Sequence, residues 1–326
     1  MATYFITGGL GFLGQYIVQA VHDYDPRAEI RVLVRTKRPT FLPIQELEGI
    51  RWVHGDLLLP ETYTSALEGV DAIIHNAAMV SFRRSEAEQV HRANVLGTRM
   101  LAETARRMGC PNFIFISSIS AVKSQPGRVA DETMYPDLEL KRKSDAYGYS
   151  KLVSEAELKR MTSQMRVVIL NPSVVLGPGS DRIEMVTRAV RFLPVLPMLQ
   201  YTNSFVDVRD VARAAVLALT KGRSGERYIV TAWNIGMVEF SRKLLQVIGK
   251  KVAVVPVSGP AVRLFDGLLW TLDLLKMNPG IRRLTEMNID KACSWEKIHR
   301  EMGWEPALSL EQSIADSFQA WKPGGE

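Results

Sequence analysis

The sequence predicts an α/β fold, a doubly wound parallel sheet with helices on both faces and a smaller C-terminal lobe. Three observations support this class. Short runs of β-branched and aromatic residues alternate with segments of helical periodicity through the first half of the chain, which is typical of parallel strands joined by crossover helices. Prolines and loops become more frequent after about residue 171. The length of 326 residues suits about two domains.

The predicted elements follow in order along the chain. Strands are expected at 3–7, 30–34, 71–75, 112–117 and 166–170, and helices at 12–24, 61–68, 86–108 and 147–163. Residues 208–218 have a further helical pattern and residues 228–231 that of a short strand, so this part is expected to return to the sheet. The predicted sheet domain is therefore 1–170 plus 206–231, and the predicted lobe is 171–205 plus 232–326.

The composition is that of an ordinary folded protein. Hydrophobic residues make up 46% and charged residues 23% of the chain, which excludes disordered, collagen-like and disulfide-rich proteins. The 41 Lys and Arg against 35 Asp and Glu give a surplus of +6, which permits an anionic ligand without indicating a nucleic-acid partner. Five dispersed histidines and two cysteines, Cys110 and Cys293, match no metal-binding pattern, so no metal is predicted.

The sequence predicts a cytoplasmic protein. The N-terminal residues lack the basic and apolar parts of a signal peptide. No apolar run approaches the roughly 18 residues of a spanning helix, and the two cysteines are expected to be reduced. The apolar segment 261–277 has an amphipathic pattern that leaves three interpretations open: it packs the lobe, covers an apolar ligand or touches lipid. Membrane contact is the least expected of these.

A glycine-rich turn follows the first predicted strand. Residues 7–14, Thr-Gly-Gly-Leu-Gly-Phe-Leu-Gly, lead directly into the first helical pattern. Gly8 allows a tight turn, Gly11 lets the backbone approach a pyrophosphate, and Gly14 lets the helix pack closely. The first helical N–H groups, at Phe12 and Leu13, offer the positive end of the helix dipole to an anion. The turn therefore predicts a dinucleotide site.

The end of the second predicted strand indicates which dinucleotide binds. An acidic residue about 20 residues after the glycine turn would bind the ribose 2′-hydroxyl of NAD. Here the strand ends in Arg35, followed by Lys37 and Arg38. A guanidinium suits a phosphate through paired, charged hydrogen bonds. NADP is therefore the predicted cofactor, with NAD as the alternative.

Tyr147 and Lys151 form a Tyr-x-x-x-Lys pair within a helical pattern. The spacing of four places both side chains on one helix face. A nearby ammonium lowers the pKa of a phenol from its usual value of about 10. Tyr147 could then exchange a proton with a substrate oxygen near neutral pH. Ser117 and Ser118 end the strand at 112–117, at the sheet edge where ligands bind, and a serine hydroxyl there can polarise a carbonyl.

Together these pieces resemble the extended branch of the short-chain dehydrogenase/reductase superfamily, the NAD-dependent epimerase/dehydratase family. The matching segments keep the family's order over roughly residues 3–220. They are the glycine turn 7–14, Gly55-Asp56-Leu57, His75-Asn76-Ala77-Ala78, Asn94, Ser117-Ser118, Tyr147-Gly148-Tyr149-Ser150-Lys151, Asn171-Pro172-Ser173 through Gly177-Pro178-Gly179, and Phe205-Val206-Asp207-Val208-Arg209-Asp210-Val211-Ala212.

The resemblance implies a Rossmann-type cofactor domain, a C-terminal substrate-binding lobe and hydride transfer at the nicotinamide. It implies that Tyr147 is the general acid/base, tuned by Lys151, which also binds the nicotinamide ribose. Ser118, or alternatively Ser117, would bind the substrate oxygen, and Asn94 matches a supporting asparagine. The implied cofactor contacts are of three kinds. Asp56 and Leu57 would lie beside the adenine, and Pro172 and Ser173 near the nicotinamide. At Asn76, Ala77 and Ala78 the chain would come close to the cofactor. The family's dimerisation through the helices at 86–108 and 147–163 implies a homodimer.

Within this branch the chain is closest in character to dihydroflavonol reductase-like and 3β-hydroxysteroid dehydrogenase-like reductases. Asn203 stands where epimerases carry an arginine that grips a nucleotide diphosphate, Arg35 suits NADP, and the lobe is apolar. The prediction is an NADP(H)-dependent oxidoreductase that reduces a ketone or aldehyde, or oxidises an alcohol, on a largely apolar small molecule. Two alternatives stay open: a sugar-nucleotide epimerase or dehydratase with tightly bound NAD, and a non-catalytic NADP-binding sensor or scaffold.

Overall fold

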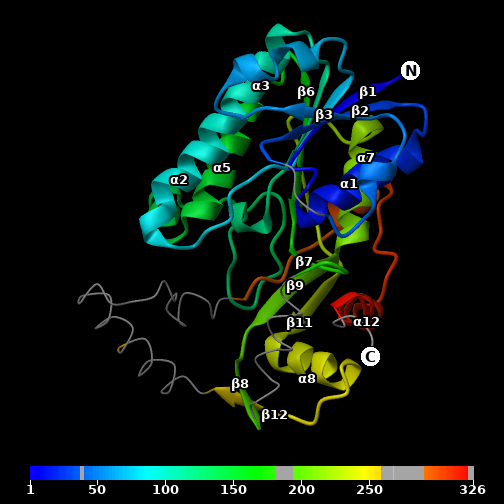
Figure 1. Ribbon diagram of the computed structural model, residues 1–326. Coiled ribbons are helices and arrows are strands. Elements are labelled where there is room, and N and C mark those ends of the chain that lie inside the picture. The colour runs from blue at the N-terminus through cyan, green and yellow to red at the C-terminus, as the bar shows by residue number, and fades with distance from the viewer. Residues whose placement is uncertain (37–39, 181–193, 258–266, 268–289, 322–326) are drawn as a thin grey trace.

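A parallel seven-stranded sheet forms the centre of the computed structural model, which describes residues 1–36, 40–180, 194–257, 267 and 290–321 (Figure 1). Its strand order is β10-β6-β5-β4-β1-β2-β3. The strands are β1 (Thr3–Thr7), β2 (Glu29–Val34), β3 (Ile50–His54), β4 (Ala72–His75), β5 (Asn112–Ile116), β6 (Arg166–Pro172) and β10 (Arg227–Val230). The predicted α/β class with a doubly wound parallel sheet is therefore confirmed.

The strand order reverses at β1, which pairs with β2 on one side and β4 on the other. Thr7 lies opposite Leu33 of β2 and His75 of β4, so these three strands end side by side. In open parallel sheets, ligands bind in the crevice at the carboxyl ends of the strands where the order reverses. The topology thus places the glycine turn, which follows Thr7, at the expected binding position.

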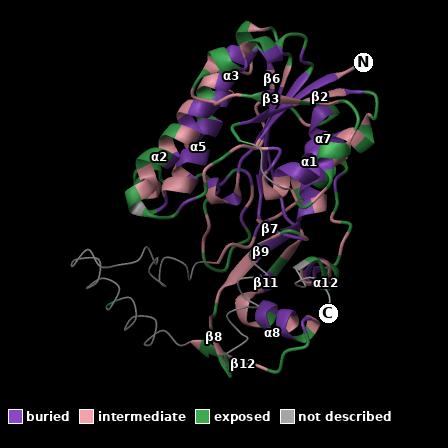
Figure 2. Cartoon of the chain, in the orientation of Figure 1, coloured by how far each residue is buried: buried purple, intermediate pink, exposed green. Residues whose placement is uncertain are grey.

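Helices cover both faces of the sheet. α1 (Phe12–Tyr24) and α7 (Val208–Thr220) lie on one face, and α3 (Gly97–Arg107) and α5 (Ala146–Lys159) on the other (Figure 1). Successive strand residues point to opposite faces. On β1, Phe5 therefore joins the α3–α5 core, whereas Ile6 joins the α1–α7 core. Because both faces are covered, the inner strands β1, β4, β5 and β6 are largely apolar runs that are buried throughout their central part (Figure 2).

The C-terminal lobe is built on smaller sheets. β7 (Val174–Leu176), β9 (Thr202–Asp207) and β11 (Trp233–Gly236) form one, and β8 (Val195–Leu199) pairs with β12 (Ala253–Val257). α8 (Met237–Val247) and α12 (Leu310–Trp321) pack beside them, with the Phe205 ring stacked on Phe240 at 4.4 Å.

One segment after α8, around α11, packs outside the lobe. α11 (Glu296–Met302) packs against β10, and its Ile298 and Met302 join the α1–α7 core together with Trp304, which is fully buried. The predicted division of the chain counts these residues with the lobe, whereas their packing joins them to the main sheet. As predicted, residues 208–218 form a helix and β10 pairs with β6 in the main sheet.

Three predicted helices differ from those observed. Residues 61–68 form two short 3-10 helices, η2 (Pro60–Thr62) and η3 (Thr64–Leu67), which are separated by the buried Tyr63. The long helix at 86–108 is divided into η4 (Arg84–Glu86), α2 (Ala87–His91), a π-helical turn η5 (Arg92–Leu96) and α3. The helix at 147–163 ends earlier, at Lys159. The edge strand β3 was not predicted, because Ile50–His54 mixes polar with apolar residues and only Val53 is buried.

Candidate active site

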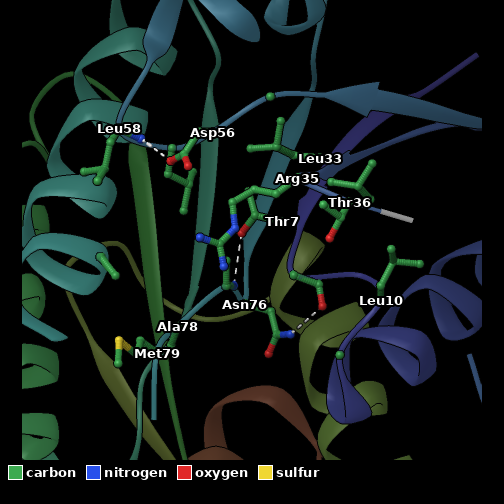
Figure 3. Close-up of a pocket in the computed structure, with 17 residues that line it drawn as sticks. Thr7, Leu10, Leu33, Arg35, Thr36, Asp56, Leu58, Asn76, Ala78 and Met79 are labelled. Atoms are coloured by element: carbon green, nitrogen blue, oxygen red, sulfur yellow. Dashed lines mark hydrogen bonds between the residues drawn. The ribbon is translucent and has the colours of Figure 1, made fainter. Parts of the chain in front are cut away.

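A cavity of about 410 Å³ opens at the carboxyl ends of β1, β2, β3 and β4 (Figure 3). Its walls come from four loops that follow these strands. The lining residues are Thr7, Gly8, Leu10, Gly11, Leu33, Val34, Arg35, Thr36, Gly55, Asp56, Leu57, Leu58, Asn76, Ala77, Ala78, Met79 and Ala93. Most of the residues that the sequence predicts around the adenine half of a dinucleotide therefore share one cavity.

The glycine turn is fixed by close backbone packing. Gly8 has a φ of +70°, and a Cβ there would lie 2.8 Å from the Cα of Ala77. A Cβ on Gly14 would overlap the carbonyl oxygen of Gly8, so α1 packs directly on the turn. Gly11 is the N-cap residue of α1, and because it has no side chain, no side-chain group caps the helix. The first helical residues are Phe12 and Leu13. The first N–H groups of a helix have no partner within it, so this end can bind an anion.

The segment after β4 is bonded to the same turn. The Asn76 side-chain amide donates to the carbonyl of Gly8 at 3.3 Å, and the backbone N–H of Ala77 donates to the Thr7 hydroxyl at 3.1 Å (Figure 3). Asn76 and Ala77 therefore shape the cavity, and Ala78 lines it next to them.

Two side chains of opposite charge, Arg35 and Asp56, line the cavity at the ends of β2 and β3. Arg35 is exposed and follows β2 directly. Asp56 follows β3, and its carboxylate accepts the N–H of Leu58 at 2.9 Å, which fixes its orientation beside Leu57. Lys37, which the sequence predicts as a second phosphate contact, lies outside the described residues.

His75 is a fully buried histidine directly behind the glycine turn. Its Nδ1 lies 2.7 Å from the Thr7 hydroxyl, and its Nε2 lies 2.8 Å from the Thr98 hydroxyl. Thr98 donates in turn to the carbonyl of Asn94 at 2.5 Å. Burial, with a smaller contribution from Lys151, lowers the pKa of His75 to about 3. The ring is therefore neutral, and this chain of bonds links the turn to the helix that carries Asn94.

This buried histidine predicts a pH-dependent stability. The unfolded chain binds a proton at His75 below about pH 6.5, whereas the folded protein does so only near pH 3. The histidine's contribution is thus fully present above pH 6.5 and is lost as the pH falls, by about 1.4 kcal/mol per pH unit within that window. Urea unfolding of His75→Met should show a lower stability at pH 7.5 but a shallower loss toward pH 5. The exposed His54→Gln should keep the wild-type slope, and an unchanged slope in His75→Met would contradict the assignment.

α5 carries the Tyr-x-x-x-Lys pair. Asp145 caps its first turn by accepting the N–H of Gly148 at 2.9 Å. Tyr147 is half-buried, and its ring meets Phe82 edge-to-face at 6.0 Å between centroids. Lys151 is only 2% exposed, and its ammonium donates to the carbonyl of Ile116 at 2.7 Å. Burial lowers the pKa of Lys151 to about 7, although Glu155 acts in the opposite direction.

The two serines at the end of β5 have different environments. Ser117 is buried, and its hydroxyl donates to the Glu155 carboxylate at 2.5 Å. Ser118 is half-buried and caps η6 (Ile119–Ala121), where its hydroxyl oxygen accepts the N–H of Ser120 at 3.1 Å. That bond leaves the hydroxyl proton of Ser118 for another acceptor. The geometry therefore favours Ser118 over Ser117 as a substrate contact.

Asn94 lies within the π-helical turn and is 2% exposed. Its amide accepts the N–H of Met79 at 2.7 Å and donates to the Met79 carbonyl at 3.0 Å and to the Ser150 hydroxyl at 2.9 Å. Ser150 donates to the carbonyl of Tyr147. Asn94 thus ties the loop after β4 to α5.

Pro172 and Ser173 close the end of β6. Pro172 is buried, and the Ser173 N–H donates to the carbonyl of Val230 at 3.0 Å. The Ser173 hydroxyl is buried, with no hydrogen-bond partner among the described residues. A buried polar group without a partner is unfavourable, so this hydroxyl suits a polar group of a bound ligand. This unpartnered hydroxyl and the glycine turn fit the nicotinamide dinucleotide that the sequence predicts.

Sequence reasoning missed Glu155 and Arg227, and it gave no role to Asn171 of the matching segment Asn171-Pro172-Ser173. All three are buried, and the Asn171 amide and the Arg227 guanidinium both donate to the Glu155 carboxylate. Glu155 could have been noticed, because it follows Lys151 by four residues and so shares its helix face. Nothing in the local sequence marks Arg227.

Among the described residues, none of the helices combines the length and the apolar character that a membrane span requires. No group of three or more His, Cys, Asp or Glu side chains among these residues could hold a metal ion.

The chain belongs to the NAD dependent epimerase/dehydratase family, whose profile matches residues 4–236. It is thus an NAD(P)-dependent enzyme of the extended short-chain dehydrogenase/reductase type, as predicted. It is 29% identical over 338 residues to sterol demethylase protein B of Methylococcus capsulatus, covering 98% of each chain. A dihydroflavonol 4-reductase-like protein of Synechocystis is 33% identical over 248 residues, covering 72% of this chain and 69% of the relative. The crystal structure of gox2253 superposes with a TM-score of 0.85 at 26% identity, covering 99% and 98% of the two chains.

Proposed function

We propose that the protein is an NADP(H)-dependent oxidoreductase that reduces a ketone or aldehyde, or oxidises the corresponding alcohol, on a largely apolar small molecule. The observation that carries this proposal is the arrangement around the end of β5. Lys151 bonds to Ile116, two residues before Ser118, while Gly148, beside Tyr147, packs on the Ser120 carbonyl. Ser118, Tyr147 and Lys151 thus come from two elements that pack directly on each other.

The cofactor would be held along the cavity at the strand ends. Gly8, Gly11 and the first turn of α1 would bind the pyrophosphate, Arg35 the 2′-phosphate, and Asp56 the adenosine end. The hydroxyl of Ser173 would satisfy a polar group at the nicotinamide end. When bound, the cofactor supplies a hydride to the substrate carbon or accepts one from it.

Residues of the chain would carry out the proton transfer that accompanies the hydride transfer. In reduction, Tyr147 gives its phenolic proton to the substrate oxygen as that oxygen gains negative charge. Ser118 donates a hydrogen bond to the same oxygen and fixes its position. The positive charge of Lys151 stabilises the phenolate that Tyr147 becomes, until a proton from solvent restores the phenol. Oxidation of the alcohol follows these steps in reverse.

The surroundings of Tyr147 support an apolar substrate. The loop after β4 carries Met79, Val80 and Phe82, and Val80 and Phe82 are 59% and 43% exposed. Exposed apolar side chains beside a reactive group suit an apolar ligand. The relative named for sterol demethylation agrees with this class of substrate. The segment 261–277, with its three interpretations, lies outside the described residues apart from Gly267.

Replacing Phe82 by alanine tests the substrate class. Loss of the ring beside Tyr147 should raise KM for a bulky apolar ketone about tenfold, which corresponds to about 1.4 kcal/mol of lost contact. The KM of a small polar ketone should change much less. Steady-state kinetics with both ketones measures the difference, and Val129→Ala, at another exposed apolar residue, is the matched control. Equal increases for the two ketones would count against an apolar substrate contact at Phe82.

The reaction itself is tested by following NADPH absorbance with a panel of apolar and polar carbonyl compounds. Oxidation of NADPH by an apolar ketone or aldehyde is the expected result. Conversion of a sugar nucleotide without net cofactor oxidation would instead identify an epimerase or dehydratase. NADPH binding without turnover of any compound would identify a sensor or scaffold.

We propose a cytoplasmic homodimer. Cys110 and Cys293 are buried free thiols, which suits a reducing compartment. α2, α3 and α5 lie on one face of the sheet, where members of this family dimerise (Figure 1). Sedimentation equilibrium measures the mass directly. The proposed cofactor domain is 1–170 plus 206–231 and the proposed substrate lobe is 171–205 plus 232–326, of which α11 and Trp304 pack on the cofactor domain.

A further inference from the structure

Glu155 lies on the same face of α5 as Tyr147 and Lys151, at successive spacings of four residues. It is 1% exposed. Its Oε1 accepts the Ser117 hydroxyl at 2.5 Å and the Asn171 amide at 2.6 Å, and its Oε2 accepts the Arg227 guanidinium at 3.3 Å. The carboxylate therefore joins the ends of β5 and β6 to the edge strand β10.

Arg227 is 1% exposed and extends this network to the chain that follows Ser118. Its guanidinium donates to the carbonyls of Ala121 at 3.2 Å, Glu132 at 2.8 Å and Met134 at 2.9 Å. It also lies 3.8 Å from the centre of the Tyr135 ring. Arg227 thus holds the loop that leaves the end of β5.

The remaining bonds of the network surround Ser118. The Asn171 amide, besides its bond to Glu155, donates to the carbonyl of Ser118 at 3.0 Å. Lys151 holds the carbonyl of Ile116, and Glu155 holds the side chain of Ser117. The bonds from Asn171, Lys151 and Glu155 thus fix the backbone carbonyls of Ser118 and Ile116 and the side chain of Ser117.

Stability does not explain such a network well. Burying an ion pair costs desolvation energy that its attraction often only balances, and an apolar pair of similar volume is often as stable. Glu155 interacts electrostatically with two buried basic side chains, Lys151 and Arg227. Burial raises the pKa of Glu155, whereas the charge of Arg227 and the hydrogen bonds from Ser117, Asn171 and Arg227 lower it. Such an arrangement suits a site where charges must be held in fixed positions.

We propose that Glu155, paired with Arg227, is a positioning residue that holds Ser118 where proton transfer by Tyr147 requires it, and that its charge stabilises the ammonium of Lys151, four residues away on the same helix face. This proposal rests on the proposed oxidoreductase function. Glu155 acts from behind, through Ser117, Asn171 and Arg227, and does not itself contact the substrate.

The charge of Glu155 also acts on Lys151. Burial lowers the pKa of Lys151 to about 7, and Glu155 is the group that raises it. Of the other groups near this lysine, His75 on β4 is neutral, and β5 offers only the Ile116 carbonyl and the Phe115 ring. Loss of the Glu155 charge should therefore lower the pKa of Lys151 further, so that the lysine is neutral over more of the working pH range.

Glu155→Gln removes the charge and keeps the shape. We expect kcat to fall roughly 10- to 100-fold through misplacement of Ser118, with the Kd of NADPH nearly unchanged. The alkaline limb of the kcat profile should move to lower pH, because Lys151 loses its proton earlier. Glu157→Gln is the matched control, since Glu157 lies two residues away on α5 and pairs with Arg99 at the surface. It should leave kcat and the pH profile at wild-type values.

A second variant separates positioning from folding. In Glu155→Leu/Arg227→Met the ion pair is replaced by apolar side chains of similar volume, so no unpaired charge stays buried, and NADPH binding reports whether the variant is folded. We expect it to bind NADPH and to show the same loss of kcat. Wild-type kcat and pH profile in either folded variant would overturn the proposal.

A measurement that needs no substrate tests the role of Glu155 separately from the proposed reaction. Titration of ¹³C-labelled lysine side chains by NMR, with Lys151 assigned from its missing signal in Lys151→Met, gives the pKa of Lys151 directly. A lower pKa in Glu155→Gln and an unchanged one in Glu157→Gln support the role of Glu155 even if no carbonyl compound is reduced. An unchanged pKa in Glu155→Gln would overturn it, whatever the wild type turns over.

Discussion

Replacing Tyr147 by phenylalanine is expected to lower kcat by roughly 10²- to 10⁴-fold, the usual contribution of a general acid/base. The substitution removes only the phenolic oxygen. The ring remains to meet Phe82, and α5 keeps its Asp145 cap, so the fold and the cofactor cavity should be unchanged. The loss should therefore appear in kcat, with the Kd of NADPH close to that of the wild type.

Tyr149→Phe is the matched control for this prediction. Tyr149 is on the same helix, two residues further on, and stacks on His91 of α2 at 6.5 Å between ring centroids. Residues two apart on a helix do not share a face. Its substitution should leave kcat within about twofold of the wild type, about 0.4 kcal/mol in activation free energy, because its side chain does not share the face of Tyr147 and Lys151. Stopped-flow measurement of NADPH oxidation and fluorescence titration of NADPH separate turnover from binding. Turnover of Tyr147→Phe near the wild-type rate would exclude the proposed proton transfer.

The features that could be predicted from the sequence are those encoded within one short segment. The glycine turn at 7–14 is an example, because strand, turn and helix start are contiguous and each glycine has a local steric reason. The same holds for Tyr147 and Lys151, whose shared face follows from helix geometry alone. The strands β1, β2, β4, β5 and β6 were recognisable because burial on both faces makes them largely apolar runs.

Features that depend on distant partners could not be predicted. Glu155 bonds to residues 16 and 72 positions away, so its role exists only in the folded sheet. The π-helical turn at Arg92–Leu96 is another case, since local propensity gives no reason to interrupt the helix. There, Asn94 bonds to Met79 and Ser150, and Thr98 bonds to His75. Tertiary bonds of this kind explain why the prediction placed Asn94 in the site without assigning it a contact.

Reversing the charge at Arg35 is expected to change the cofactor preference. If Arg35 binds the 2′-phosphate, Arg35→Asp removes hydrogen bonds to a charged group that are worth about 1.5–3 kcal/mol, so kcat/KM for NADPH should fall roughly 10- to 100-fold. An aspartate at the end of β2 would instead accept the ribose 2′-hydroxyl and improve kcat/KM for NADH. The ratio of the two efficiencies should therefore change by roughly 10²- to 10³-fold in favour of NADH.

The position of Arg35 distinguishes this effect from a general loss of positive charge. Arg35 lines the cavity at the carboxyl end of β2, whereas the exposed Arg27 lies just before the other end of the same strand. Arg27→Asp changes the net charge equally but should leave the ratio of NADPH to NADH efficiency unchanged. Salt gives a second criterion, because KM for NADPH should rise with ionic strength in the wild type and much less in Arg35→Asp. If the ratio were the same in the wild type and Arg35→Asp, the 2′-phosphate could not lie at Arg35, and the preference for NADP would lose its physical basis.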